Sequence, residues 1–157
     1  YSLYGDGLYA VADQGDVWFS FGGYLYRYRD ATLDHYSVSE GIISDKITSL
    51  AAGPGNALWV GTEAGASYFD GQNWQNFTTS DGLVADQVQA IRVDSRGWVW
   101  IGTLQGVSVY DGTTWTNFTT LNSGLAANSV LRIMIAPNGR SIWFHTTSGF
   151  SRYMPAK

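Results

Sequence analysis

Residues 88–118, VQAIRVDSRGWVWIGTLQGVSVYDGTTWTNF, decide the fold. They contain four short runs rich in β-branched and aromatic residues, at 88–93, 98–103, 107–110 and 115–118. Turn-forming residues with Gly or Asp separate these runs, and no run has the periodicity of an amphipathic helix. The stretch therefore predicts four β-strands, each joined to the next by a tight connection.

The same pattern recurs along the chain. Four tryptophans follow one another at intervals of 41, 41 and 43 residues: Trp18, Trp59, Trp100 and Trp143. Residues 39–79 and 80–120 are identical at 15 of 41 positions without a gap. Four strands in a unit of this length are typical of a propeller blade. We therefore predict an all-β fold, a β-propeller of four four-stranded blades, with the large tryptophan rings packed between neighbouring blades.

The predicted propeller is a single domain over residues 1–157. Its blades lie at about 5–37, 38–78, 79–119 and 120–157 by the repeat spacing. The fourth unit lacks a fourth strand, and the Tyr-x-x-Tyr spacing of residues 1–4 resembles such a strand. An N-terminal strand in the last blade would close the ring and remove its free edges. Two other arrangements fit the repeats: part of a larger propeller, or two chains joined in one eight-blade ring.

The repeated residues also indicate a family. Gly-Leu or Gly-Ile, Trp-x-Gly-Thr and an aromatic-Asp-Gly triplet recur at the same spacing in the second and third units: 41–42, 59–62 and 69–71, then 82–83, 100–103 and 110–112. This pattern resembles the two-component regulator propeller repeat. The resemblance implies a sensory propeller attached to signalling proteins, with an extracytoplasmic location, periplasmic or secreted. It also implies more blades than this chain holds.

The composition argues against several classes of function. The net charge of −4 comes without a basic cluster, so we expect no nucleic-acid partner. No apolar run approaches the roughly 20 residues that span a bilayer, so we expect no membrane span. Cysteine is absent, and there are two His and two Glu without metal-ligand spacing. We therefore expect no catalytic residues, no metal site and no cofactor.

The loops of the predicted blades place a candidate binding site. Connections between second and third strands share one face with the long loops between blades, and long loops on a rigid scaffold often carry binding. His145 breaks the repeat at a position where the other units have Gly or Ser. The candidate ligand-binding residues on this loop face are His145, Asp45, Asp86, Asn128, Glu63 and Gln105. For Asp45, Asp86 and Asn128, bracing of their own loops by bonds to backbone N–H groups is the simpler interpretation.

The sequence thus predicts a non-catalytic module that recognises a small molecule, a glycan or a protein at the loop face. Two alternatives have support in the sequence. Aromatic residues make up 15% of the chain and the loops are polar, which suits a lectin-like carbohydrate binder. The low content of charged residues, 14%, and the open ends suit a self-assembling surface protein, a homo-oligomer.

Overall fold

The computed structural model describes residues 8–137, 139 and 141–154. These residues form four antiparallel sheets, three with four strands and one with three. The first sheet contains β1 (Tyr9–Val11), β2 (Val17–Phe21), β3 (Tyr24–Arg29) and β4 (Thr32–Tyr36). The second contains β5 (Ile47–Ala52), β6 (Leu58–Thr62), β7 (Gly65–Phe69) and β8 (Trp74–Phe77). The third contains β9 (Val88–Val93), β10 (Val99–Thr103), β11 (Val107–Tyr110) and β12 (Trp115–Phe118), and the fourth β13 (Val130–Ile135), β14 (Ile142–Thr146) and β15 (Gly149–Tyr153).

The strand order confirms the predicted blades. In every sheet consecutive strands are hydrogen-bonded neighbours, and β9 to β12 reproduce the four runs of residues 88–118 within one residue. One turn of 3-10 helix, Val38–Glu40, was not expected from the sequence. Ser37 caps this turn, and its N–H donates to the Glu40 carboxylate at 2.7 Å. The fold is therefore all-β apart from one capped turn between the first two sheets.

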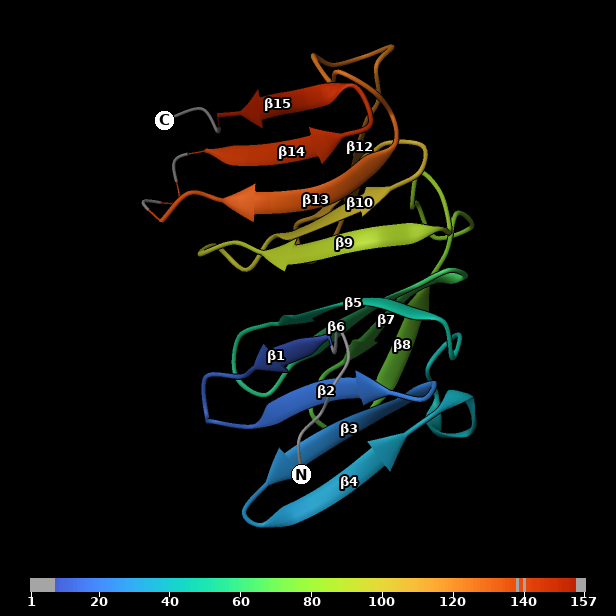
Figure 1. Cartoon of the computed structure of the whole chain (residues 1–157), viewed down its shortest axis with the longest axis vertical. Coiled ribbons are helices and arrows are strands. Elements are labelled where there is room, and N and C mark those ends of the chain that lie inside the picture. Colours follow the sequence, from blue (N-terminus) through green and yellow to red (C-terminus); the bar gives the residue numbers. More distant parts are fainter. Residues whose placement is uncertain (1–7, 138, 140, 155–157) are drawn as a thin grey trace.

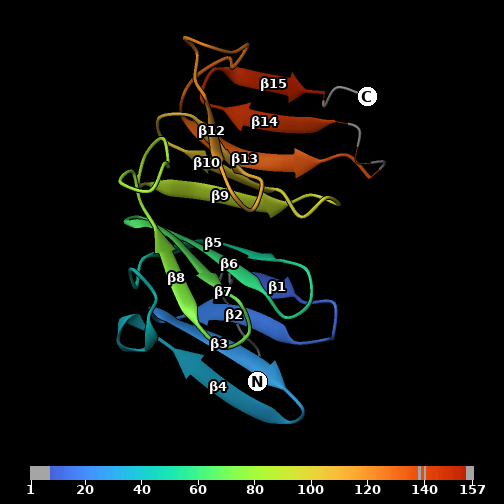
Figure 2. The ribbon, with the colours of Figure 1, turned by 180° about the vertical axis from the view of Figure 1, so that it is seen from behind.

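The four sheets follow one another along the longest axis of the molecule (Figure 1). Their innermost strands are neighbours, since β1 packs against β5, β5 against β9 and β9 against β13. Figure 2 shows the same order of sheets from behind. The first and fourth sheets lie at opposite ends, so the described residues form an arc of blades (Figure 1). The closing strand predicted at residues 1–4 lies outside the described residues.

Each pair of neighbouring sheets encloses an apolar core that contains one repeated tryptophan. Trp18, Trp59 and Trp100 are 0%, 4% and 1% exposed. Their ring centroids lie 5.6, 6.1 and 5.0 Å from an aromatic ring on the third strand of the next sheet: Phe69, Tyr110 and Tyr153. The predicted packing between blades is confirmed for these three tryptophans. Trp143, in the last sheet, is 38% exposed instead.

Two glycines show how closely neighbouring sheets approach. A Cβ atom on Gly61 would lie 2.6 Å from Cγ1 of Val88, and one on Gly102 would lie 2.8 Å from Cγ1 of Val130. Such distances leave no room for a side chain, because interiors are already close-packed. His145 occupies the equivalent position in the fourth sheet. The described residues include no following sheet whose innermost strand would lie against His145.

Candidate functional site

The innermost strands of all four sheets line one cavity of about 740 Å³. Its wall includes residues of β1, β5, β9 and β13, so it lies along the inner side of the arc. Tyr9, Arg92 and Arg132 are exposed in this wall, which shows that the cavity is open to solvent. Its volume is within the range of about 300–1,000 Å³ that is usual for small-molecule sites.

The polar part of the wall carries positive charge, without a compensating negative charge among the described residues. Arg92 lies on β9 and Arg132 on the neighbouring strand β13, and Gln89 and Thr48 add neutral polar groups. None of the described residues that line the cavity is Asp or Glu. Arg92 uses Nη1 to donate to the carbonyl of Ile91 at 2.7 Å, and neither arginine forms an ion pair with a described carboxylate. Guanidinium groups in such a setting can bind a carboxylate or a sulfate.

Two of the residues predicted from the sequence brace loops. Oδ1 of Asp86 accepts a hydrogen bond from the N–H of Thr79 at 2.7 Å, and Oδ1 of Asn128 accepts one from the N–H of Thr120 at 2.7 Å. These bonds hold the connections between sheets in place, as the simpler interpretation of these residues expects. Asp45 is exposed, and no equivalent bond forms there within the described part of the chain.

The loop face groups the predicted residues sheet by sheet. In the second sheet the N–H of Glu63 donates to the carbonyl of Lys46, next to Asp45, at 3.1 Å. Equivalent backbone bonds at 3.3 and 3.1 Å join the same two connections in the third and fourth sheets. These bonds bring Glu63 near Asp45 and Gln105 near Asp86, and they bring the end of the strand that carries His145 near Asn128. None of these six is among the residues that line the cavity.

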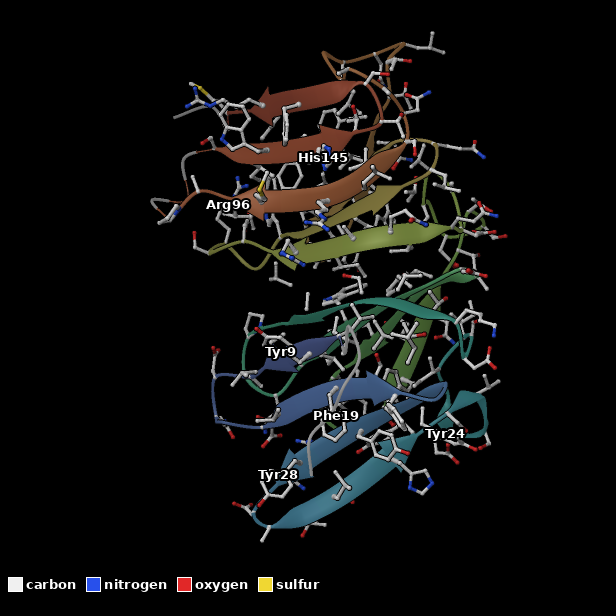
Figure 3. The ribbon with its side chains drawn as sticks, viewed as in Figure 1. Tyr9, Phe19, Tyr24, Tyr28, Arg96 and His145 are labelled. Atoms are coloured by element: carbon white, nitrogen blue, oxygen red, sulfur yellow. The ribbon has the colours of Figure 1, made fainter. Side chains whose placement is uncertain are left out.

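His145 on β14 is nevertheless one strand away from the cavity wall (Figure 3). It pairs in register with Arg132 on one side and with Phe150 on the other. Its ring is half-buried and stacks on Phe150, with 4.7 Å between centroids and 16° between planes. The stacked, partly covered ring fixes the orientation of His145 without a bond to the other predicted site residues.

Neither cavity arginine was predicted from the sequence, because binding residues were expected on the loop face alone. A signal was present: Arg92 is a charged residue inside the predicted strand 88–93, where the second unit has Ala51. A charge in such a strand is expected only where the strand meets water or a ligand.

Two kinds of feature are not found in the described part of the chain. No group of three or more His, Asp and Glu residues there could hold a metal ion. None of its helices is long and apolar enough to cross a membrane.

Four similar sheets arranged around one cavity define a β-propeller protein. Residues 82–105 match the family model described as two component regulator propeller. This match falls on the third unit and confirms the resemblance that the repeated motifs indicate. None of the curated protein sequences matches the chain.

Solved structures show the same fold at low sequence identity. The extracellular domain of a B. thetaiotaomicron protein described as a hybrid two component system has a TM-score of 0.79 and 24% identity, over 94% of this chain and 21% of that chain. PorZ, a surface component of the type-IX secretion system of Porphyromonas gingivalis, has a TM-score of 0.67 and 17% identity, over 93% of this chain and 25% of that chain. A virginiamycin B lyase from Staphylococcus aureus has a TM-score of 0.66 and 13% identity, over 98% of this chain and 58% of that chain. The chain thus spans about a fifth of the length of the first of these structures.

Proposed function

We propose that this protein is the non-catalytic recognition part of an extracytoplasmic sensory protein and that it binds an anionic ligand in the cavity between its innermost strands. The observation that carries the proposal is the pair Arg92 and Arg132 in a cavity wall without described acidic residues. The match of residues 82–105 to the two component regulator propeller model supports the sensory role. The similarity to an extracellular domain of a two component system supports both the role and the location.

The chemistry of the wall defines the class of ligand. Two guanidinium groups on neighbouring strands favour a carboxylate or a sulfate, and this attraction is strongest where no carboxylate of the protein competes. Gln89 and Thr48 supply hydrogen-bonding groups, while Leu131 and Tyr9 supply apolar surface. A small acidic sugar or another organic anion satisfies all three features.

Calorimetric titration with uronic acids and sulfated sugars, beside the corresponding neutral sugars, tests this function. Each of Arg92→Gln and Arg132→Gln removes a charge-assisted hydrogen bond worth about 1.5–3 kcal/mol, so affinity should fall roughly 10- to 100-fold. Arg29→Gln is the matched control, because Arg29 is an exposed arginine on β3 outside the cavity wall. Unchanged affinity in the double variant of Arg92 and Arg132 would exclude the cavity as the anion site.

Two further outcomes discriminate the alternatives. Neutral glycans that bind as tightly as the acidic ones would favour a lectin-like carbohydrate binder. A loss of affinity in His145→Ala, with full binding in the arginine variants, would move the site to the loop face, where a glycan or a protein is the candidate partner.

A further inference from the structure

The outward faces of the first and fourth sheets are rich in exposed apolar side chains. On the first sheet Tyr24 is 45% exposed and Tyr28 is 49% exposed. Figure 3 shows both on the first sheet, at the end of the molecule away from the fourth. On the fourth sheet Trp143, Met134 and Phe150 are 38%, 46% and 61% exposed. Sheet faces of this composition usually mark an interaction surface.

Trp143 and Tyr28 are the unpaired members of a contact that the chain makes three times. Within the chain, the tryptophan of one sheet meets the third-strand aromatic ring of the next sheet at 5.0–6.1 Å between centroids. Trp143 holds the tryptophan position in the last sheet, and Tyr28 holds the aromatic position in the first. The two ends of the molecule therefore present complementary halves of one repeated interface.

An arginine adds a second element of complementarity. At the first internal interface, the Arg27 guanidinium lies 5.0 Å from the ring centroid of Trp18 and 5.8 Å from that of Phe69. In the fourth sheet, Arg152 lies 5.4 Å from the ring centroid of Trp143, the equivalent pair. The residue of the first sheet that corresponds to Phe69 is Tyr28. Docking of the two end faces would complete a second arginine–aromatic sandwich.

The first face lacks the groups that receive a covalently connected blade. At the three internal interfaces, a backbone N–H of the connecting loop donates to a third-strand serine hydroxyl at 2.8–2.9 Å. Tyr26 takes the place of this serine, and Tyr24 takes the place of the glycine two residues before it. The ring of Tyr26 stacks on Phe19, with 5.2 Å between centroids and 12° between planes. The site of the connecting loop is thus filled by aromatic rings.

The fourth face departs from the repeat at a position of close approach between sheets. His145 replaces the glycine that elsewhere lets the innermost strand of the next sheet approach. The fourth face keeps Trp143 and Arg152 of the repeated interface, and the first face keeps Tyr28 but lacks the serine and the glycine found where a connecting loop docks. A blade that docks without a connecting loop, such as one from a separate molecule, needs neither of these two residues of the first face.

We propose that the occupant of each end face is a second copy of this chain. The fourth sheet of one copy docks on the first sheet of the other, with Trp143 and Arg152 of one copy against Tyr28 of the other. A head-to-tail interface used twice by two copies gives a closed ring of eight blades, which is within the range of known propellers. The inference requires no bound ligand, so it stands or falls independently of the proposed function.

The mass in solution tests the proposal, by light scattering of the wild-type chain over a range of concentrations. We expect about twice the 17.2 kDa of one chain. Trp143→Glu and Tyr28→Glu should each give monomers with unchanged far-UV circular dichroism, since both side chains are partly exposed. Leu121→Ser is the matched control and should leave the dimer intact, because Leu121 is 95% exposed and lies in a loop.

Mixing the two variants tests the head-to-tail geometry. Each variant keeps one intact face, so an equimolar mixture should form a dimer through a single interface although neither variant associates alone. A wild-type monomer at all concentrations would overturn the proposal and leave other blades as the occupant of the faces. Assemblies larger than two copies, or a Trp143→Glu variant that still dimerises, would overturn the closed head-to-tail ring.

Discussion

Replacing Trp100 by Ala tests whether the repeated tryptophans hold the blades together. Trp100 is 1% exposed, and its ring centroid lies 5.0 Å from that of Tyr153 and 5.9 Å from that of Phe144. Its indole Nε1 also donates to Oδ2 of Asp94 at 3.1 Å. The substitution therefore removes packing between the third and fourth sheets together with one hydrogen bond to a carboxylate.

The expected magnitude follows from the buried area. A tryptophan buries up to about 250 Å², equivalent to about 6 kcal/mol at roughly 25 cal/mol per Å². Alanine keeps part of this area and the neighbouring side chains relax, so core Trp→Ala substitutions cost about 3–5 kcal/mol. Trp100→Phe keeps most ring contacts and loses the indole hydrogen bond, so its cost should be about 1–2 kcal/mol.

Urea denaturation followed by far-UV circular dichroism measures these losses, because this signal does not depend on the substituted fluorophore. Thr116→Ala is a control at an exposed position of β12 and should change the free energy of unfolding by less than about 0.5 kcal/mol. Hydrogen exchange should rise mainly in β13 to β15, which dock on Trp100. An unfolding midpoint of Trp100→Ala equal to that of the wild type would refute the packing argument.

Three further predictions concern other parts of the fold. Gly102→Ala places a Cβ 2.8 Å from a valine of β13 and should lower the free energy of unfolding, measured by urea titration, by about 1–3 kcal/mol. Gly124→Ala, with no atom within 4 Å of the new Cβ, should be near neutral. Equal costs would contradict the close approach of the sheets. In the wild type the buried Arg27 guanidinium lies 2.5 Å from the Asp16 carboxylate, and Asp16→Ala removes this partner. The free energy of unfolding should fall by about 3–5 kcal/mol, and a loss below about 1 kcal/mol would be inconsistent with a buried pair. Hydrogen bonds from two neighbouring serines lower the pKa of Glu40 from 4.5 to about 2. The stabilising contribution of Glu40 is therefore present above pH 4.5 and is lost as the pH falls to about 2. In thermal melts over this range the midpoint should fall more steeply with pH for the wild type than for Glu40→Gln, and parallel curves would argue against the contribution.

The sequence determines the blades because each blade is a local structure with a repeated signature. The strands of a unit are close in sequence, and the tryptophan, glycine and aromatic positions recur because each interface between blades is alike. Gly61 and Gly102 illustrate this, since the same close approach of the next sheet imposes the same residue. A local pattern that is repeated in the chain can therefore be recognised without knowledge of long-range contacts.

The cavity could not be predicted in the same way. Arg92 and Arg132 belong to different units, and only the arrangement of the innermost strands around one space brings them into one wall. The loop residues were easier to recognise. The Oδ1 atoms of Asp86 and Asn128, however, accept hydrogen bonds from backbone N–H groups of their own loops. Polar residues that recur once per unit tend to serve the unit, and such recurrence is weak evidence for a ligand site.

Departures from the repeat are more informative when their position in the arc is considered. In the first and fourth sheets of the described arc, Tyr24 and His145 stand where the neighbouring unit has glycine, so these two changes alter the interfaces at its ends. Arg92 lies in the third sheet, which has a neighbour on both sides, and no missing neighbour explains its charge. Its side chain is accommodated because it lines the cavity, and its charge without a described acidic partner is the feature from which we propose a ligand of opposite charge.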